Sequence, residues 1–328
     1  MTTTVLVTGG AGFIGAYVSR ALLAKGMRVV VYDFQPNGNV LDMLLPEAGT
    51  NTSRLLKEAG EITDGWRLLD ICRRFDVEYA VHLASPLTMD VVANPFTGIR
   101  DICTGTATLF ATAKTAGLKR VVWASSVAVF GPKSTYPEGP LPDSAWHHPA
   151  NLYGSAKSLC ETLAVRAYEK DGLDVVGLRL SVVYGAGRLR GYMSYPSHLM
   201  RQAASGQAIH AAYGPQRLHW QYVDEVAAMI GTALLAERPG GGRTYNAAGD
   251  SRAWREAAAA IRAARPGLAV TVGEERDPAL TDTVEDYDAS GFARDYGYRL
   301  GWPLERGVRD TLDTYSLMSS AAKPGSAG

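Results

Sequence analysis

The sequence predicts an α/β protein with a doubly wound parallel sheet, followed by a smaller mixed α/β lobe. Apolar, β-branched runs alternate with amphipathic stretches of helical spacing over residues 1–184. A glycine-rich turn follows the first of these runs, at residues 9–15. Strands joined by helices in this way pair in parallel, with helices on both faces of the sheet. The alternation lapses after Gly185, where we expect the second lobe to begin.

The elements of the first part are expected in strict alternation. Val5–Val7 forms a buried strand, and Gly26 and Gly117 close the two helices that precede them, as glycines often do. Residues 35–53 are rich in turn formers and poor in periodicity, so we expect a loop with one helical turn near 41–45. The remaining strands are expected at 27–32, 54–57, 79–84, 120–129 and 175–184, and the helices at 13–25, 66–74, 94–116 and 150–169.

The second part is expected to bind the substrate and to return partly to the main sheet. A loop rich in glycine, arginine and tyrosine covers residues 185–197. Helical spacing follows at 197–204, 224–236 and 253–264, with short strands at 244–247 and 269–273 and two further helical patches. The domains are therefore predicted at 1–184 and 185–318. The small, polar residues 319–328 are expected to form a disordered tail.

The composition is that of a neutral globular protein. The 328 residues are 46% hydrophobic and 20% charged, with 33 basic and 33 acidic side chains. This balance predicts no nucleic-acid partner and no anionic membrane surface. We expect no signal peptide, no membrane span and a cytoplasmic location. The three cysteines lack metal-ligand spacing and are expected to be reduced, while His147 and His148 are expected at the surface, so no metal site is predicted.

The glycine turn has the form G-x-x-G-x-x-G and predicts a phosphate-binding loop. Gly9 permits the turn, Gly12 lets the backbone approach a phosphate, and Gly15 lets the helix pack close to the strand. Phe13 and Ile14 begin a helix whose first N–H groups have no intrahelical partner. These donors and the positive end of the helix attract a pyrophosphate.

Asp33 ends the second predicted strand, 18 residues beyond Gly15. A carboxylate at this spacing accepts hydrogen bonds from the adenosine ribose and repels a 2′-phosphate. Phe34 follows it, and no arginine stands close by to receive a 2′-phosphate. The pattern favours NAD over NADP, although a solvated acid at a strand end is the plainer alternative.

Tyr153 and Lys157 stand four residues apart on a predicted helix, so they share one face. An ammonium near a phenol stabilises the phenolate, which makes the tyrosine a candidate general base. Y-x-x-x-K alone is common, and without further context an ordinary, half-exposed helix face is the better explanation. Its context is more specific, because Ser126 ends a strand 27 residues earlier and offers a hydroxyl for the substrate oxygen.

The glycine turn, Asp33, Ser126, Tyr153 and Lys157 together resemble the extended short-chain dehydrogenase/reductase family, the NAD-dependent epimerase/dehydratase group. The resemblance covers residues 3 to about 315 and implies a Rossmann-type fold. The matching stretches are residues 8–15 for T-G-G-x-G-F-I-G, 82–85 for H-L-A-A, 125–131 for S-S-x-x-V-Y-G, 178–180 for L-R-x and 222–227 for Y-V-D-D-V-A.

The resemblance also implies roles for individual residues. Tyr153 is the general acid/base, Lys157 tunes it and holds the nicotinamide ribose, and Ser126 positions the reacting oxygen. Glu61 and Ile62 contact the adenine, and Leu83, Ala84 and Ser85 lie under the cofactor, with Ser85 reaching the substrate. A homodimer through helices 94–116 and 150–169 is also implied.

Three departures from the family pattern limit the substrates and reactions that we expect. Val182 replaces the asparagine of L-R-x-x-N, and Leu218-His219 replaces an Arg-Asp pair, so two contacts to a nucleotide sugar are lost. Val127-Ala128 replaces the Asp-Glu pair of the 4,6-dehydratases and cannot do its acid/base work. Asp101-Ile102 replaces a stretch that contains asparagine, with no predicted effect.

The expected function is hydride transfer between NAD and a secondary alcohol of a small polar substrate: a sugar, a sugar acid or a hydroxy acid. Arg188 and Arg190 suit a carboxylate, and Tyr192 lies in the same loop, although a solvated basic loop is an equal alternative. The runner-up is a nucleotide-sugar 4-epimerase acting through a transient ketone. A non-catalytic dinucleotide sensor is a third possibility, which the Tyr153/Lys157 pair disfavours.

Overall fold

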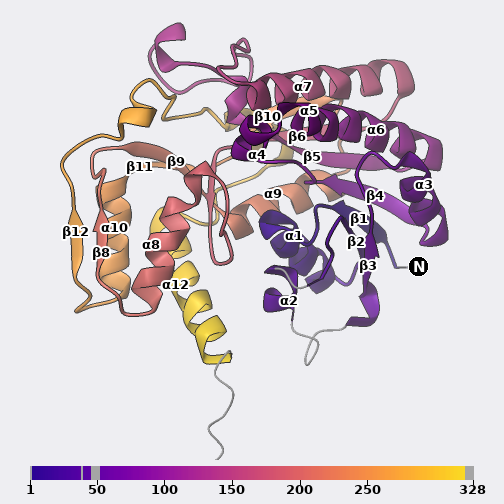
Figure 1. Cartoon of the computed structure of the whole chain (residues 1–328). Helices are drawn as coiled ribbons and strands as arrows, with labels where there is room; N and C mark the ends of the chain where they lie inside the picture. Colours follow the sequence, from indigo (N-terminus) through magenta and orange to yellow (C-terminus); the bar gives the residue numbers. More distant parts are fainter. Residues whose placement is uncertain (1, 38–39, 46–51, 322–328) are drawn as a thin grey trace, which may run out of the picture.

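The larger part of the chain is built around a seven-stranded, wholly parallel sheet (Figure 1). The computed structural model describes residues 2–37, 40–45 and 52–321. The strand order is β3-β2-β1-β4-β5-β6-β10, so the chain starts in the middle and winds outward in both directions. The strands are β1 (Thr4–Thr8), β2 (Arg28–Asp33), β3 (Leu55–Ala59), β4 (Val77–His82), β5 (Arg120–Ser126), β6 (Val175–Leu180) and β10 (Arg243–Asn246).

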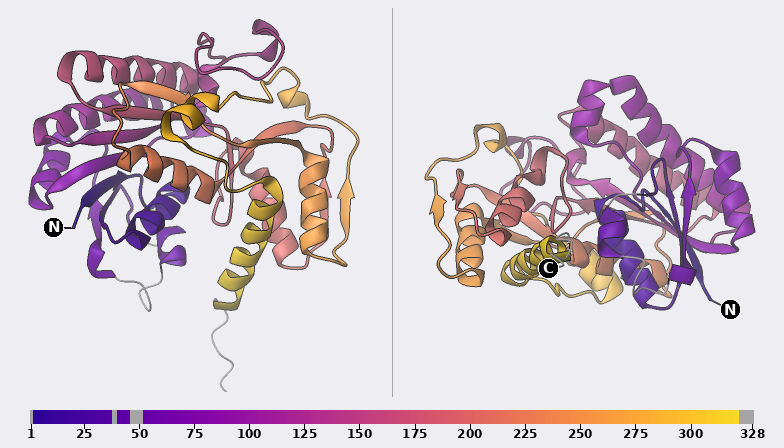
Figure 2. Two further views of the ribbon diagram at one scale, coloured as in Figure 1. Left: turned by 180° about the vertical axis from the view of Figure 1, so that it is seen from behind. Right: turned by 60° about the horizontal axis from the view of Figure 1, so that its bottom comes forward.

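Helices cover both faces of this sheet, which confirms the predicted doubly wound architecture. Val5 and Val7 of β1 pack into one core with helices α1 and α9, while Leu6 between them points into a second core with α3, α6 and α7. Figure 2 shows the same layers from behind. The helices of this part are α1 (Phe13–Ala24), α2 (Val40–Leu44), α3 (Gly65–Arg74), α6 (Gly105–Ala116), α7 (Leu152–Asp171) and α9 (Val223–Leu235).

The long helical stretch predicted at 94–116 is present, with a π-helical turn inside it. Helix α4 (Thr88–Ala93) comes first and α5 (Pro95–Ile99) follows it. The π-turn η2 (Arg100–Thr104) and then α6 continue from α5 without a break. Gly117 ends α6 in the left-handed conformation, at φ 71°. The predicted asparagine replacement, Asp101-Ile102, lies in this π-turn. Its local geometry is therefore wider than that of an α-helix.

Two predicted strands are shorter than expected. The strand predicted at 120–129 ends at Ser126, because the Ser126 hydroxyl accepts a hydrogen bond from the Ala128 nitrogen at 3.1 Å and starts the 3₁₀ turn η3 (Val127–Val129). The strand predicted at 175–184 breaks at Ser181, whose nitrogen donates to the Gln221 side chain. The second half is a separate strand, β7 (Val182–Tyr184), which leaves the main sheet.

The second lobe contains two small sheets. The strand β9 (Arg217–Tyr222), which we did not predict, lies between β7 and β11 (Asp250–Ala253), while β8 (Ile209–Ala211) pairs with β12 (Val270–Val272). Figure 1 shows this lobe beside the main sheet. Its helices are α8 (Tyr195–Ala204), α10 (Trp254–Ala264) and α12 (Leu304–Ala321), and α11 (Ser290–Tyr296) packs beside β10.

Two predictions about this region need comment. Strand β10 and helix α9 return to the main body, as expected, since β10 pairs with β6. Helix α12 extends to Ala321, so residues 319–321 are helical where the start of a disordered tail was expected. The rest of that segment, 322–328, lies outside the described residues. Over the part of the chain that is described, no helix has the length and apolarity to cross a bilayer.

Candidate active site

The glycine turn packs so closely that two of its glycines cannot be replaced without movement. Gly9 has a φ of 69° and donates its N–H to the Tyr32 carbonyl at 2.8 Å. A β-carbon at Gly9 would lie 2.6 Å from the Ala84 nitrogen, and one at Gly15 would lie 2.2 Å from the Gly9 oxygen. The turn is therefore pressed between the end of β4 and the start of α1.

The N-terminus of α1 is built to receive an anion. Gly12 is its N-cap, no described side chain caps it, and its first turn carries no acidic residue. Phe13 and Ile14 follow as the first helical residues and are half-buried. The free N–H groups and the positive end of the helix fit the pyrophosphate of a dinucleotide.

Asp33 lies against this turn at the end of β2. One carboxylate oxygen accepts a hydrogen bond from the Ala11 nitrogen at 3.3 Å, and the other accepts one from the Gln35 nitrogen at 3.2 Å. Burial raises the pKa of the carboxyl, although the backbone hydrogen bonds oppose that shift. Phe34 beside it is 78% exposed. The carboxylate therefore lies beside the glycine turn, at the carboxyl end of β2.

The segments after β3 and β4 complete this edge of the sheet. The Tyr32 hydroxyl donates to the Glu61 carbonyl at 2.8 Å, and Ile62 packs against Gly105 of α6. The Leu83 nitrogen donates to the Thr8 carbonyl at 3.0 Å, and Leu83 and Ala84 lie against Gly9 of the glycine turn, with Ser85 next in the chain. Residues 61–62 and 83–85 thus follow the carboxyl ends of β3 and β4, where ligands of such sheets bind.

Helix α7 places Tyr153 and Lys157 at the same edge. The Asn151 side chain caps the helix by accepting from the Gly154 nitrogen at 2.9 Å. Lys157 is only 4% exposed, its Nζ lies 5.8 Å from the centroid of the Tyr153 ring, and it donates to the Ala124 carbonyl at 2.9 Å. The ammonium therefore joins the helix to the last residues of β5.

Ser126 ends β5 beside this helix. A β-carbon at Gly154 would lie 2.0 Å from the Ala128 oxygen, so the first turn of α7 packs directly on the turn that follows Ser126. The structure thus brings together the three residues predicted to be catalytic, Ser126, Tyr153 and Lys157.

Glu161 is a site-supporting residue that we did not predict. It accepts a hydrogen bond from the Ser125 hydroxyl at 2.6 Å and two from the Arg179 guanidinium, at 2.9 and 2.8 Å. Burial opposes its ionisation, but hydrogen bonds from His147, Arg179 and Ser125 outweigh burial and lower its pKa to about 2. The signal was available, because Glu161 continues the i, i+4 spacing of Tyr153 and Lys157 by one turn.

His147 belongs to the same network and is only part-exposed, where we expected a surface residue. Its Nδ1 lies 2.7 Å from the Ser158 hydroxyl of α7, and its Nε2 lies 3.2 Å from the Arg179 guanidinium. The side chain is 25% exposed. His148 is exposed, as expected.

The loop after β7 separates the two arginines that were predicted to bind a carboxylate. Arg190 is 73% exposed and pairs with Asp90 at 2.9 Å. Arg188 points inward and donates to the Val183 carbonyl. Burial lowers its pKa to about 10, and the charge of the Tyr153 phenolate acts in the opposite direction. Tyr192 begins the turn η5 (Tyr192–Ser194), but its side chain is not among the described ones.

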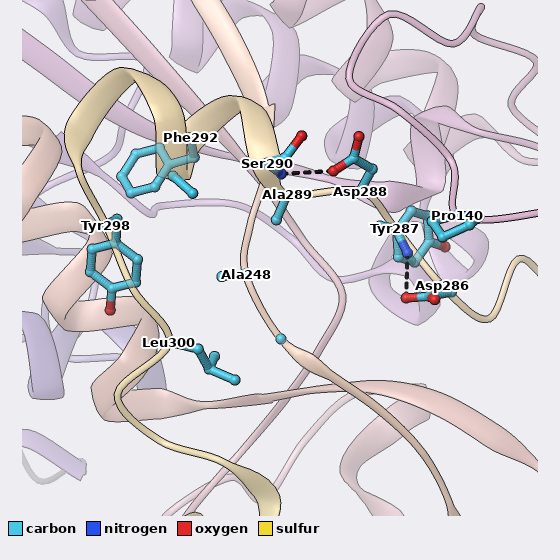
Figure 3. A pocket seen from close by; sticks show the side chains of 12 residues that line it. Pro140, Ala248, Asp286, Tyr287, Asp288, Ala289, Ser290, Phe292, Tyr298 and Leu300 are labelled. Carbon is cyan, nitrogen blue, oxygen red and sulfur yellow. Dashed lines mark hydrogen bonds between the residues drawn. The ribbon is translucent and has the colours of Figure 1, made fainter.

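A surface pocket of about 510 Å³ lies away from these residues (Figure 3). It is lined by Ala248, Tyr287, Phe292 and Tyr298, among others, and by none of the residues predicted for the site. Its two carboxylates, Asp286 and Asp288, accept hydrogen bonds from neighbouring backbone N–H groups (Figure 3). We therefore place the active site at the sheet edge and not in this pocket.

Comparison with known proteins agrees with this geometry. A model described as the NAD dependent epimerase/dehydratase family matches residues 5–248. A D-erythronate dehydrogenase from Cupriavidus necator is 28% identical over 97% of this chain and 99% of its own. A UDP-glucose 4-epimerase from Rhizobium meliloti is 33% identical over 48% of this chain, a match that spans 44% of that protein.

Solved structures show the same fold. A UDP-glucose 4-epimerase from Thermus thermophilus, in complex with NAD, is 24% identical and has a TM-score of 0.76 over 95% of this chain and 99% of its own. At this identity the likeness concerns the fold alone. It agrees with the predicted Rossmann-type architecture.

Proposed function

The chain belongs to the NAD-dependent epimerase/dehydratase family, and on that premise we propose that it oxidises a secondary alcohol of a small polar substrate. The observation that carries the proposal is the packing of α7, which holds Tyr153 and Lys157, on the end of β5, where Ser126 lies. The D-erythronate dehydrogenase that matches along nearly its whole length supports a dehydrogenase acting on a sugar acid or a hydroxy acid.

In this proposal Tyr153 removes the proton of the substrate hydroxyl. Lys157 stabilises the phenolate, because its buried ammonium is fixed near the ring by the Ala124 carbonyl. Ser126 donates a hydrogen bond to the reacting oxygen and so positions it for Tyr153. The reverse reaction uses the same groups, with Tyr153 as the acid.

The cofactor is NAD, which accepts the hydride from the carbinol carbon. We assign its pyrophosphate to Gly9, Gly12 and Gly15 with Phe13 and Ile14, and its adenosine to Asp33, Phe34, Glu61 and Ile62. Leu83, Ala84 and Ser85 would hold the nicotinamide half, and Lys157 would bind its ribose. The close-packed turn and the uncapped helix fit this assignment.

A 4-epimerase remains the second candidate, since a relative with that name shares 33% identity over half of the chain. It would use the same three residues and return the hydride to the opposite face of a transient ketone. Two buried apolar side chains argue against a nucleotide sugar. Val182 and Leu218, which replace polar residues of the family pattern, are 7% and 6% exposed and offer no hydrogen bond to a diphosphate.

A direct assay separates the candidates. Purified protein is mixed with NAD and a panel of sugars, aldonic acids and hydroxy acids, and NADH formation is followed by absorbance. We expect NADH with at least one small polar alcohol. A protein that releases no NADH but inverts a nucleotide-linked sugar would be an epimerase.

We also propose a cytoplasmic homodimer without nucleic-acid or membrane partners. Leu152, Leu159 and Tyr168 of α7 are 53%, 51% and 40% exposed, and Phe96 of α5 is 88% exposed. A second copy packed against α5 and α7 would cover these apolar side chains. Light scattering after size-exclusion chromatography should give twice the chain mass of 35.1 kDa.

A further inference from the structure

Arg188 occupies an unusual place for a charged side chain. A β-carbon placed on Gly191 would lie 3.7 Å from its Nη2 and 3.3 Å from the Leu87 side chain, so Gly191 brings this loop and the segment that follows Ser85 close together next to the guanidinium. Its Nη1 donates to the Val183 carbonyl. Arg188 is close enough to Tyr153 for their charges to interact. The guanidinium therefore borders the site from the second lobe.

No carboxylate of the described residues pairs with this guanidinium. By contrast, Arg190, two residues later, is open to solvent and already paired with Asp90. The Arg188 side chain is part-buried. Withdrawing a cation from water even in part is costly without a counter-ion, and a bound anion would offset that cost. Among the described residues, the Val183 carbonyl is the one acceptor of this guanidinium, through Nη1, so the other N–H groups remain available to a ligand.

The loop that carries Arg188 is fixed before any ligand arrives. The Gly185 nitrogen donates to the Ser197 hydroxyl at 3.3 Å, the Tyr17 hydroxyl donates to the Ala186 carbonyl at 2.9 Å, and the Gly187 nitrogen donates to the Tyr315 hydroxyl at 3.1 Å. Three elements far apart in the sequence thus hold three successive residues. The backbone immediately before Arg188 is therefore held in place by hydrogen bonds.

We propose that Arg188 binds the carboxylate of the substrate, which makes the substrate a hydroxy acid, an inference that rests on the proposed dehydrogenase function. A guanidinium holds a carboxylate through two parallel hydrogen bonds. With the acid group held there, a hydroxyl on a nearby carbon reaches Tyr153 and Ser126. Sugars and polyols without an acid group lack this anchor.

A phosphate or diphosphate is the other anion that a guanidinium binds. The buried Val182 and Leu218 favour the carboxylate, because a nucleotide diphosphate finds no polar partner at those positions. Binding of uridine diphosphate, measured beside binding of an aldonic acid, distinguishes a diphosphate site from a carboxylate site.

The test compares four-carbon aldonic acids with the tetritols of the same configuration. We expect wild-type kcat/KM to be at least 100-fold higher for an aldonic acid than for its tetritol. Arg188→Met should remove most of that preference by raising KM for the acid, while NAD affinity stays within twofold. Arg188→Lys should have an intermediate effect, since it keeps the charge and loses the fork. Arg190→Met is the matched control and should keep the preference.

Binding is measured separately from turnover, so the two proposals fail in different ways. Isothermal titration of an aldonic acid into the NAD-saturated Tyr153→Phe variant should show binding that Arg188→Met weakens at least 30-fold. Three results would overturn the carboxylate anchor. The preference for the acid over the tetritol could be equal in wild type and Arg188→Met, or Arg190→Met could lose it to the same extent as Arg188→Met. Uridine diphosphate, and not the acids, could also bind in a way that depends on Arg188. Acid binding that depends on Arg188 without any NADH formation would uphold the anchor and reject the dehydrogenase.

Discussion

Glu161 accepts a hydrogen bond from Ser125 at 2.6 Å, which fastens the neighbour of Ser126 to the helix that carries Tyr153. The Arg179 guanidinium completes the junction and is 5% exposed. The opposite end of β5 has a similar pair, in which Arg120, 6% exposed, donates to Asp174 at 2.6 Å. Each end of β5 is therefore tied to neighbouring elements through an arginine–carboxylate pair, at one end by way of Ser125 and at the other through Arg120 itself.

These two pairs permit a matched experiment. Arg179→Met and Arg120→Met should each lower the free energy of unfolding by about 3–5 kcal/mol. The first leaves the buried Glu161 carboxylate without its partner, and the second removes the donor to Asp174 and to three backbone carbonyls. Only Arg179→Met should also lower kcat, by about tenfold per folded molecule, since it loosens the strand end that positions Ser126. Urea denaturation gives the stability, and NAD titration counts the folded sites. Equal kcat in the two variants would reduce the Glu161 network to a purely structural role.

The assignment of Tyr153 is tested by removing one oxygen atom. Tyr153→Phe should lower kcat by at least 1000-fold, because it removes the hydroxyl proposed to take the proton, and it should leave the Kd for NAD within about threefold. Stopped-flow turnover and fluorescence titration measure the two quantities. Turnover close to that of wild type would remove Tyr153 from the mechanism.

Asp33 should set the choice between NAD and NADP. Wild type should bind NAD more tightly, since a carboxylate accepts from the ribose hydroxyls and repels a 2′-phosphate. Asp33→Ala should weaken NAD binding by about tenfold, the loss expected for hydrogen bonds to a charged group. The same variant should bind NADP more tightly than wild type does. Competitive titration with both cofactors checks this, and equal wild-type affinities would contradict the role of Asp33.

Two glycine-to-alanine changes in helices should have opposite effects. A methyl group at Gly15 would lie 2.2 Å from the Gly9 oxygen, so Gly15→Ala should displace the turn and weaken NAD binding by at least tenfold. At Gly231 in α9 the first heavy atom that a methyl would meet is 4.0 Å away, in Lys25. Gly231→Ala should therefore stabilise the protein by about 0.5–1 kcal/mol through helix propensity. Thermal unfolding with and without NAD distinguishes the two.

His82 should make stability depend on pH. It is buried at the end of β4, within hydrogen-bond distance of the Thr8 and Thr106 hydroxyls, and burial, with the nearby Lys157, lowers its pKa to about 3. The unfolded chain binds a proton below about pH 6.5 that the folded protein excludes. The stabilising contribution is thus complete above pH 6.5 and is lost as the pH falls toward 3.

The size of this effect follows from the shift. Between pH 6.5 and 5 the free energy of unfolding should fall by up to about 1.4 kcal/mol per pH unit through this residue. His82→Asn should reduce that slope. Urea denaturation at half-unit intervals measures it for both proteins, and identical slopes would show that His82 does not titrate as described.

Much of the main sheet was predictable because its signals are local. The Gly9–Gly15 turn and the four-residue step from Tyr153 to Lys157 are fixed by short-range geometry, and both lie where they were expected. The break at Ser181 was not predictable, since the apolar residues on both sides are buried and periodicity does not show a change of sheet. Strand β9 was missed for the same reason, because its partners come from distant parts of the chain.

The site shows the same division between local and long-range information. Arg188 and Arg190 are the same residue type in the same loop, and only the folded chain shows that one turns inward and the other pairs with Asp90. His147 was predicted at the surface. Its partners, Ser158 and Arg179, come from α7 and β6, and the sequence does not show that they lie beside it. Long-range pairing of polar side chains leaves no pattern in a single sequence.

The three hydrogen bonds that hold residues 185–187 have a thermodynamic consequence for recognition. The conformational entropy of this loop is lost when the chain folds and not when a ligand binds. A ligand that reaches Arg188 therefore meets a support that is already ordered, and more of the interaction energy appears as affinity. Loosening the loop at Tyr17 or Tyr315 should weaken binding without removing a single contact to the ligand.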